Sequence, residues 1–215
     1  MSIYQEEKQS VYNATMALYK AGLIRLSAGN ISQRTYDGNI AITPSGLPYD
    51  VMSVDDIVII DLESKIIEGE LKPSSEVPMH TAIYKSIKEV NAIVHTHSIY
   101  AITFAVAGQP LEPVCVEGLA ARGTVPVAQY AAPGSTKAGE VVLDELRKQP
   151  GLRAVLLRNH GLVVVAADME TAWQTAYKVE LQAQIILQAR ILGTPTALTN
   201  EQIEEIYQIY RNIKR

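Results

Sequence analysis

The sequence predicts an α/β or α+β fold built around one largely antiparallel or mixed sheet. Short apolar runs rich in β-branched residues alternate with longer segments whose apolar residues recur at helical spacing. Several neighbouring β-like runs are joined by links too short for a helical crossover, which disfavours a doubly wound parallel sheet. The 215 residues contain no repeat, linker or low-complexity segment, so a single domain over residues 1–215 is expected.

The first part of the chain should form a helix followed by short strands. Val11, Ala14, Leu18 and Ala21 fall on one helical face, and Gly22 follows as a stop signal. The segment RLSAGNIS (25–32) is expected to be a glycine-containing turn. Three β-like runs come next, at GNIAIT (38–43), DIVIID (56–61) and KIIEG (65–69).

Helices and strands continue to interleave along the rest of the chain. The segment KPSSEVPMHTAIYKSI (72–87) predicts a loop entering a helix, with Ser74 or Ser75 as its cap and Pro78 in its first turn. The remaining expected elements are a strand at 92–98, a helix at 99–108, a strand at 125–130, a helix at 136–148, two buried strands within 154–167 broken at Asn159–Gly161, a long helix from Met169 to Leu192 capped by Asp168, and a last helix from Asn200 to about Ile213.

The composition restricts the partners and the compartment. The net charge is −4 and no block of Lys or Arg is present, so neither nucleic acid nor an anionic membrane is an expected partner. No apolar run reaches the ~20 residues that span a bilayer, and the N-terminus lacks the pattern of a signal peptide. Cys115 is the only cysteine, which predicts a small buried side chain, no intrachain disulfide and a cytoplasmic protein.

Two of the four histidines are one residue apart. On a strand, His95 and His97 would point to the same face, with Thr96 opposite, and would form a pair of metal ligands. His160, at the end of an apolar run and before Gly161, is the best candidate for the third ligand of an open site. Three neutral nitrogen donors favour Zn²⁺, with Mn²⁺ or Co²⁺ possible. Satisfied core or surface histidines are the alternative interpretation.

Glu76 and His80 lie one helical turn apart at the start of the helix expected after residue 76. A carboxylate at a helix N-terminus is stabilised by the helix dipole, which is one explanation for Glu76. An acid/base group beside the metal is the other, and the motif alone leaves both open. For His80 a supporting or structural role is favoured over metal binding.

Three short segments combine small residues with hydroxyls or amides: SAGNIS (27–32), TPSG (43–46) and PSSE (73–76). Their backbone N–H groups and short donors can bind phosphate without a Lys- or Arg-rich pocket. Each is also ordinary turn chemistry. Together with a metal triad they indicate a small phosphorylated molecule as ligand. Neither a Walker-type loop nor a G-x-G-x-x-G after a strand is present, so nucleotide cofactors are not indicated.

In this order and spacing, AGNIS, TPSG, PSSE, HTHS and NHG resemble the class II aldolase and adducin head family. The resemblance covers about residues 5 to 210 and is greatest to the L-fuculose-1-phosphate aldolase branch. It implies a three-layer α/β/α domain with a central, mainly antiparallel sheet. It also implies a homotetramer whose sites lie near subunit interfaces.

The resemblance further implies a chemistry and a set of site residues. Zn²⁺ would be held by His95, His97 and His160, with Glu76 as acid/base and a possible fourth ligand. A ketose 1-phosphate would be cleaved to dihydroxyacetone phosphate and an aldehyde through a zinc-stabilised enediolate. The phosphate would contact six residues: Gly29, Asn30, Ser45, Gly46, Ser74 and Ser75.

The sequence also departs from the family pattern. Fuculose-phosphate aldolases use a tyrosine at the aldehyde end, where this chain has Glu117. Methylthioribulose-1-phosphate dehydratases carry a glutamate acid/base at the position of Glu117 but lack a glutamate at the position of Glu76. Ribulose-phosphate 4-epimerases usually have aspartate at the position of Glu76. A catalytic role is therefore predicted for Glu117, with a solvated carboxylate as the alternative. A neighbouring subunit's C-terminal tyrosine, used by the aldolases, corresponds most nearly to Tyr210.

Four alternatives to an aldolase remain open. A 4-epimerase, a dehydratase or a decarboxylase of a phosphorylated sugar acid could use the same scaffold. A non-enzymatic interaction domain like the adducin head is the fourth, although it should have a broken triad. A Schiff-base aldolase would need a desolvated lysine, and Lys72, Lys85 and Lys137 all look solvated.

Overall fold

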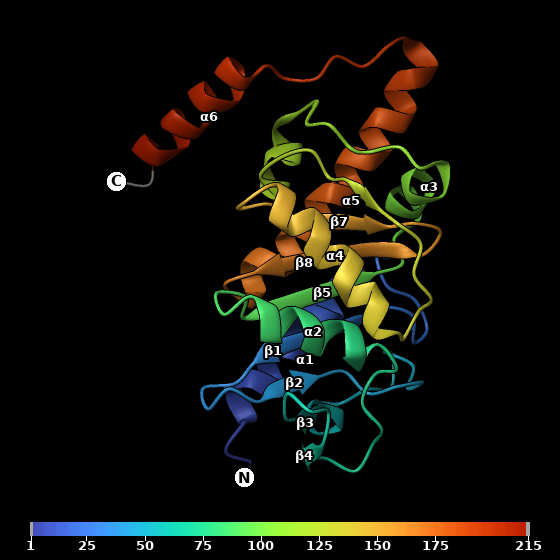
Figure 1. Cartoon of the computed structure of the whole chain (residues 1–215), viewed down its shortest axis with the longest axis vertical. Helices are drawn as coiled ribbons and strands as arrows, with labels where there is room; N and C mark the ends of the chain where they lie inside the picture. Colours follow the sequence, from blue (N-terminus) through green and yellow to red (C-terminus); the bar gives the residue numbers. More distant parts are fainter. Residues whose placement is uncertain (1, 214–215) are drawn as a thin grey trace.

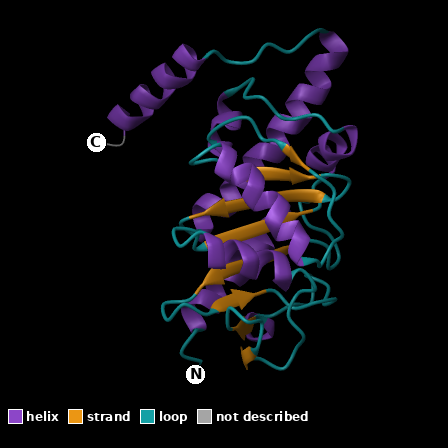
Figure 2. Cartoon of the chain, in the orientation of Figure 1, coloured by secondary structure: helices purple, strands orange, loops and turns teal. Residues whose placement is uncertain are grey.

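An eight-stranded sheet crosses the molecule in the order β4-β3-β2-β1-β5-β8-β7-β6 (Figure 2). The computed structural model describes residues 2–213. All neighbouring strands are antiparallel except β6 and β7, which are parallel. The prediction of a largely antiparallel, mixed sheet is therefore confirmed. The strands are β1 Asn30–Arg34, β2 Ile40–Ile42, β3 Val58–Ile60, β4 Ile66–Glu68, β5 Ala92–Thr96, β6 Val127–Ala128, β7 Ala154–Leu157 and β8 Gly161–Ala166.

Helices cover both faces of this sheet, as Figure 1 shows. Helices α2 and α4 pack together on one face, and α1, α3 and α5 pack on the other. The three-layer α/β/α architecture expected from the family resemblance is thus confirmed. The helices are α1 Gln5–Lys20, α2 Val77–Ser86, α3 Ile99–Ala107, α4 Thr136–Lys148, α5 Met169–Leu192 and α6 Asn200–Ile213, with short 3₁₀ helices η1 Val54–Asp56 and η2 Val116–Ala121.

Two separate hydrophobic cores lie on the two faces of the sheet. Successive side chains of a strand point to opposite faces, so Ala92 and Val94 join the core under α1 and α5. Ile93, between them, joins the core under α2 and α4. Both faces are covered, which explains why the central strands are continuously apolar. The same alternation directs His95 to the α2 side of the sheet.

The helices at 136–148, 169–192 and 200–213 have the predicted bounds. Asp168 caps α5, because its carboxylate accepts a hydrogen bond from the N–H of Thr171 at 2.7 Å. Gly108 ends α3 in the left-handed conformation. These elements were predictable because periodicity, caps and stop residues agree locally.

Strand β1 was not predicted, since its residues were assigned to a turn. Only Ile31 in its sequence NISQR is apolar. Its polar side chains are held by partners from other elements; the Ser32 hydroxyl, for example, contacts both His80 and Tyr84. Such tertiary hydrogen bonds allow a polar segment to form a central strand, and they cannot be predicted from the local sequence pattern.

Two smaller predictions were also wrong. The strand expected at 125–130 is reduced to Val127–Ala128, because only these residues pair with β7. The N-cap position of α2 belongs to Glu76 rather than to a serine, and no side chain caps the helix. Ser74 instead accepts a hydrogen bond from the Glu76 N–H at 3.2 Å.

Helix α6 extends away from the three layers and is joined to α5 by an extended segment (Figure 1). The Tyr207 hydroxyl donates to the carbonyl of Leu119 in η2 at 3.1 Å. Within residues 2–213, no helix has the length and apolar character needed to cross a bilayer.

We expect Gly29→Ala to destabilise the protein more than Gly38→Ala. Both glycines have φ near +90°, so both alanines carry the same backbone strain of about 1–2 kcal/mol. A Cβ at residue 29 would also lie 2.7 Å from Ile24 Cγ2 and 2.8 Å from the His95 carbonyl, whereas one at residue 38 meets nothing within 4 Å. Urea denaturation should show an additional loss of about 1–3 kcal/mol for Gly29→Ala. Equal losses would contradict the close approach of β1 to β5.

Candidate active site

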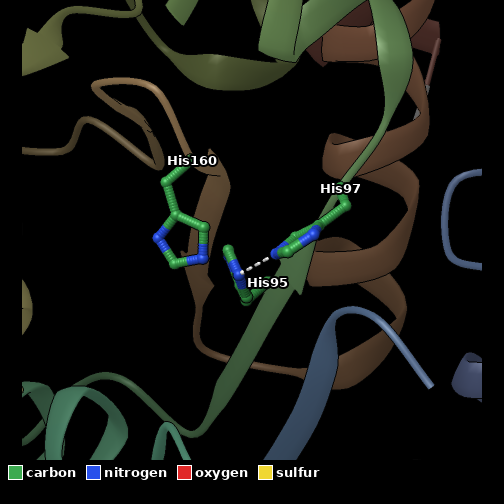
Figure 3. Close-up of side chains that lie close together, drawn as sticks. All are labelled: His95, His97 and His160. Atoms are coloured by element: carbon green, nitrogen blue, oxygen red, sulfur yellow. Dashed lines mark hydrogen bonds between the residues drawn. The ribbon is translucent and has the colours of Figure 1, made fainter. Parts of the chain in front are cut away.

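His95, His97 and His160 turn their rings toward one another, as Figure 3 shows. His95 is on β5, and His97 follows the end of that strand. His160 is in the turn between β7 and β8, and β8 pairs with β5. Gly161 allows this turn to approach β5, because a Cβ there would lie 2.5 Å from the Thr96 carbonyl. The structure therefore brings the three predicted ligands together.

The three rings have the spacing of a metal-binding cluster. Their centroids are 4.7–5.0 Å apart, and one ring nitrogen from each lies within 4.8 Å of the others. Nitrogens bound to tetrahedral zinc at 2.0–2.1 Å are about 3.3 Å apart. The His95 and His97 Nε2 atoms are 3.0 Å apart. Small side-chain rotations would suffice to place all three nitrogens around one ion.

The hydrogen bonds around His95 favour a cation in this cluster. The Nδ1–H of His95 donates to the Leu162 carbonyl at 3.0 Å, which leaves the Nε2 lone pair free. That Nε2 lies 3.0 Å from His97 Nε2 and 2.9 Å from Glu76 Oε2. Three electron-rich atoms are brought together only if a proton or a metal ion lies between them. The donor set therefore fits a divalent ion.

Burial makes His97 and His160 suitable neutral ligands. It lowers the pKa of both rings to about 4, and the electrostatic effect of the neighbouring His95 ring acts in the same direction. Both are therefore unprotonated near neutral pH, which metal binding requires. His160 Nδ1 is buried and has no hydrogen-bond partner among residues 2–213. Its other ring nitrogen, Nε2, faces the other two histidines (Figure 3) and lies 3.5 Å from Glu76 Oε1.

Glu76 is the carboxylate of this site. Its Oε2 is 2.9 Å from His95 Nε2, and its Oε1 is 3.5 Å from His160 Nε2. Asn30 Nδ2 and the Gly134 N–H each donate to it at 3.3 Å. Burial raises the pKa of Glu76, but His95, His160 and Asn30 outweigh it and hold the pKa well below its usual range. Glu76 is therefore an ionised, buried carboxylate.

Gly134 was not anticipated from the sequence. Residues 131–135, between the expected strand and the expected helix, were assigned no role. Gly134 has φ +75°, and a Cβ there would lie 3.0 Å from the Ser75 carbonyl. The glycine therefore lets this loop lie against the segment that carries Glu76. A proline–glycine pair before a helix is too common to reveal such a contact from sequence.

The three predicted phosphate-binding segments converge beside Glu76. The Ser45 N–H donates to the Lys72 carbonyl at 2.8 Å, and the Ser74 N–H donates to the Thr43 carbonyl at 3.1 Å. Thr43 Oγ1 accepts from the Ile31 N–H at 3.2 Å, which joins the first segment to the second. The N-terminus of α2 begins at the same place and favours negative charge.

The six predicted phosphate ligands divide into two groups. Ser45, Gly46 and Ser75 are exposed and free to meet a ligand. The others are buried: Gly29, Asn30 and Ser74. Both ends of the Asn30 amide are engaged, because Nδ2 donates to Glu76 and Oδ1 accepts from His80. The three buried residues therefore hold the phosphate-binding segments in shape, and the three exposed residues present hydrogen-bond donors to a ligand.

Two predicted catalytic residues lie apart from the histidines. Glu117 is half-buried in η2. The pKa of the nearby Cys115 thiol is raised, mainly by burial and to a smaller extent by its hydrogen bond with Glu117. Tyr210 is exposed on α6. Of the carboxylates in residues 2–213, only Glu76 lies within 4.0 Å of a ring nitrogen of these histidines. The roles of Glu117 and Tyr210 stay predictions.

The same fold occurs in known proteins. The sequence profile of the class II aldolase and adducin N-terminal domain matches residues 9–187. The chain belongs to the class II aldolase and adducin family. A 5-deoxy-D-ribulose 1-phosphate aldolase of Bacillus thuringiensis is 35% identical over 205 residues, which cover 95% of each chain.

Two further members of the family show its range. A solved structure of an L-fuculose 1-phosphate aldolase superposes with a TM-score of 0.88 at 31% identity and covers 98% of each chain. An L-ribulose-5-phosphate 4-epimerase of Salmonella paratyphi B is 39% identical over 108 residues, about half of either chain. Aldolases and an epimerase are thus both among the relatives.

We expect His160→Ala to weaken zinc binding by more than about 100-fold. Even the loss of a residue that only hydrogen-bonds to a metal ligand lowers metal affinity about 10–100-fold. Metal content after dialysis against graded chelator, measured by mass spectrometry, would show the loss. His80→Gln is the matched control, because His80 bonds to Ser32 and Asn30 and is absent from the cluster. Equal zinc retention by His160→Ala and the parent protein would contradict the assignment of His160 as a ligand.

Proposed function

We propose that this protein is a metal-dependent aldolase that cleaves a ketose 1-phosphate to dihydroxyacetone phosphate and an aldehyde. The observation that carries the proposal is that the Glu76 carboxylate contacts the histidine cluster and also Asn30 of the first phosphate-binding segment. Relatives named as aldolases of fuculose and deoxyribulose phosphates support this substrate class.

The residues of the site divide the work of such a reaction. The hydroxyl groups of Ser45 and Ser75 and the backbone N–H groups of Gly46 and Ser75 hold the phosphate at one end of the substrate. A divalent ion bound by the histidines supplies Lewis acidity toward the substrate carbonyl and hydroxyl oxygens. When the C3–C4 bond breaks, its electron pair stays on C3 as an enediolate, and C4 leaves as the aldehyde carbon.

Glu76 is the group that moves the proton at C3. Its Oε atoms are held by N–H donors from Asn30 and Gly134, which keep the carboxylate in one orientation. Delivery of a proton from Glu76 to C3 completes dihydroxyacetone phosphate, and its removal starts the reverse reaction. The O4 proton must be taken at the aldehyde end of the substrate, where Glu117 and Tyr210 are predicted to act.

The proposal includes the predicted zinc ion, the cytoplasmic location and the homotetramer with sites near subunit interfaces. Helix α6 extends away from the sheet, and Ile191 and Leu192 at the end of α5 are almost fully exposed. An exposed apolar surface of this kind supports association with further copies of the chain.

A 4-epimerase or a methylthioribulose-1-phosphate dehydratase-like enzyme is the second candidate. Glu117 favours it, because a second carboxylate could serve as an additional acid/base. The similarity to an epimerase over half of the chain also supports it. Glu76, in contrast, favours the aldolase.

Release of dihydroxyacetone phosphate is the direct test. We expect at least one of L-fuculose, L-rhamnulose and 5-deoxyribulose 1-phosphates to be cleaved. A chelator should stop the release, and added zinc should restore it. A coupled dehydrogenase assay measures the product. If the metal-loaded protein releases nothing from any of these, the aldolase proposal is wrong and epimerase or dehydratase chemistry takes its place.

The two glutamates should separate the candidates. We expect Glu76→Gln to retain fold and metal but to lose at least about 100-fold in cleavage, because acid–base catalysis contributes 10²–10⁴-fold. Glu117→Gln should leave an aldolase slower or less selective and should abolish a dehydratase. Steady-state kinetics, zinc content and melting temperature would be measured for both variants. Normal cleavage by Glu76→Gln would refute its role as acid/base.

A further inference from the structure

A continuous line of buried polar side chains leads from Glu76 into the core between the sheet and α2. Asn30 Nδ2 lies 3.3 Å from Glu76 Oε2, and Asn30 Oδ1 lies 2.6 Å from His80 Nε2. His80 Nδ1 is 2.6 Å from Ser32 Oγ, which is 2.9 Å from the Tyr84 hydroxyl. All five side chains are buried. Two elements supply the line beyond Glu76, because Asn30 and Ser32 are on β1 and the other two are on α2.

The chemistry of these groups allows one direction of hydrogen bonding. Glu76 Oε2 accepts from the Asn30 NH₂ group, and the Asn30 carbonyl faces His80. His80 then carries its proton on Nε2, and its Nδ1 accepts from the Ser32 hydroxyl. Ser32 in turn accepts from the Tyr84 hydroxyl. Every donor in the line therefore points toward Glu76.

The line is electrically neutral beyond Glu76. Burial lowers the pKa of His80 to about 3, with a smaller electrostatic contribution from His95. Burial raises the pKa of Tyr84 above its ordinary value. Neither group therefore changes its charge near neutral pH, and the direction of the line is set by geometry alone.

We propose that His80 is a positioning residue that acts through Asn30 to hold the Glu76 carboxylate in the orientation from which it moves the substrate proton. The inference rests on the proposed aldolase function of Glu76. If His80 carried its proton on Nδ1, the Asn30 amide would turn over and place its carbonyl against the carboxylate. The contact of Asn30 Nδ2 with Glu76 Oε2 excludes that arrangement, and Ser32 complements it by donating to Nδ1.

The partial reaction at C3 tests this role directly. The rate of deuterium exchange from solvent into dihydroxyacetone phosphate would be measured for the zinc-loaded protein and for His80→Leu and His80→Gln. We expect His80→Leu to lower the exchange rate and kcat about 10–100-fold, while KM and zinc content stay unchanged. His80→Gln keeps an N–H donor for Asn30, so it should recover most of the lost rate.

Thr15→Val is a matched control for the removal of a buried polar group. Thr15 is buried on α1, on the opposite side of the sheet, and its hydroxyl donates only to the Val11 carbonyl of its own helix. Its exchange rate should equal that of the parent protein. Equal losses in His80→Leu and His80→Gln, normal exchange in His80→Leu, or loss of zinc from it would each overturn the positioning role.

A second measurement keeps the inference testable apart from the reaction. Two-bond ¹H–¹⁵N NMR spectra should show the His80 proton on Nε2, and Ser32→Ala should shift it partly to Nδ1 and slow the exchange. Ser32→Ala also replaces His80→Leu if that variant does not fold. A parent protein without exchange would refute the proposed function. A proton on Nδ1 in the parent would refute the directed line whatever the reaction is.

Discussion

The contact between Glu76 and His95 joins the helical layer to the central sheet, and the rest of the site is arranged around it. Strand β5 lies between β1 and β8, with His95 opposite Asn30 on one side and Val163 on the other. Alternation along β5 sends His95 toward α2, whose N-terminus presents Glu76. The histidine cluster, the proposed acid/base Glu76 and the predicted phosphate-binding segments thus meet at one cross-strand pair.

This arrangement is physically demanding because it buries a negative charge. An ionised carboxylate out of water is costly unless charges and hydrogen bonds compensate it. Asn30 and Gly134 supply neutral donors, which offset part of that cost. The remaining compensation must come from the neighbouring imidazole groups or from a bound cation. The electrostatics of Glu76 therefore link the acid/base to the metal, and neither group is understandable alone.

The sequence predicted most of the fold but only the separate pieces of the site. Helices α4, α5 and α6 were predictable because their caps and apolar periodicity are local signals. The histidine cluster was predictable because a two-residue spacing on a strand and a glycine after His160 restrict the geometry. Strand β1 was hidden by its polar residues, whose partners come from α2 and α1. The same long-range contacts hid the line behind Glu76, since Asn30 and His80 are 50 residues apart.

In the proposed function, the geometry also separates proton transfer from aldehyde recognition. His95, Asn30 and Glu76, on β5, β1 and at the start of α2, are buried within the three layers. Glu117 and Tyr210 lie on η2 and α6, and these two elements contact each other through Tyr207 and Leu119. Changes in η2 and α6 can therefore alter which aldehyde is accepted while the buried proton-transfer machinery stays intact. In a chain whose Glu117 departs from the tyrosine of fuculose-phosphate aldolases, we accordingly infer that the aldehyde differs and that the chemistry at C3 is shared.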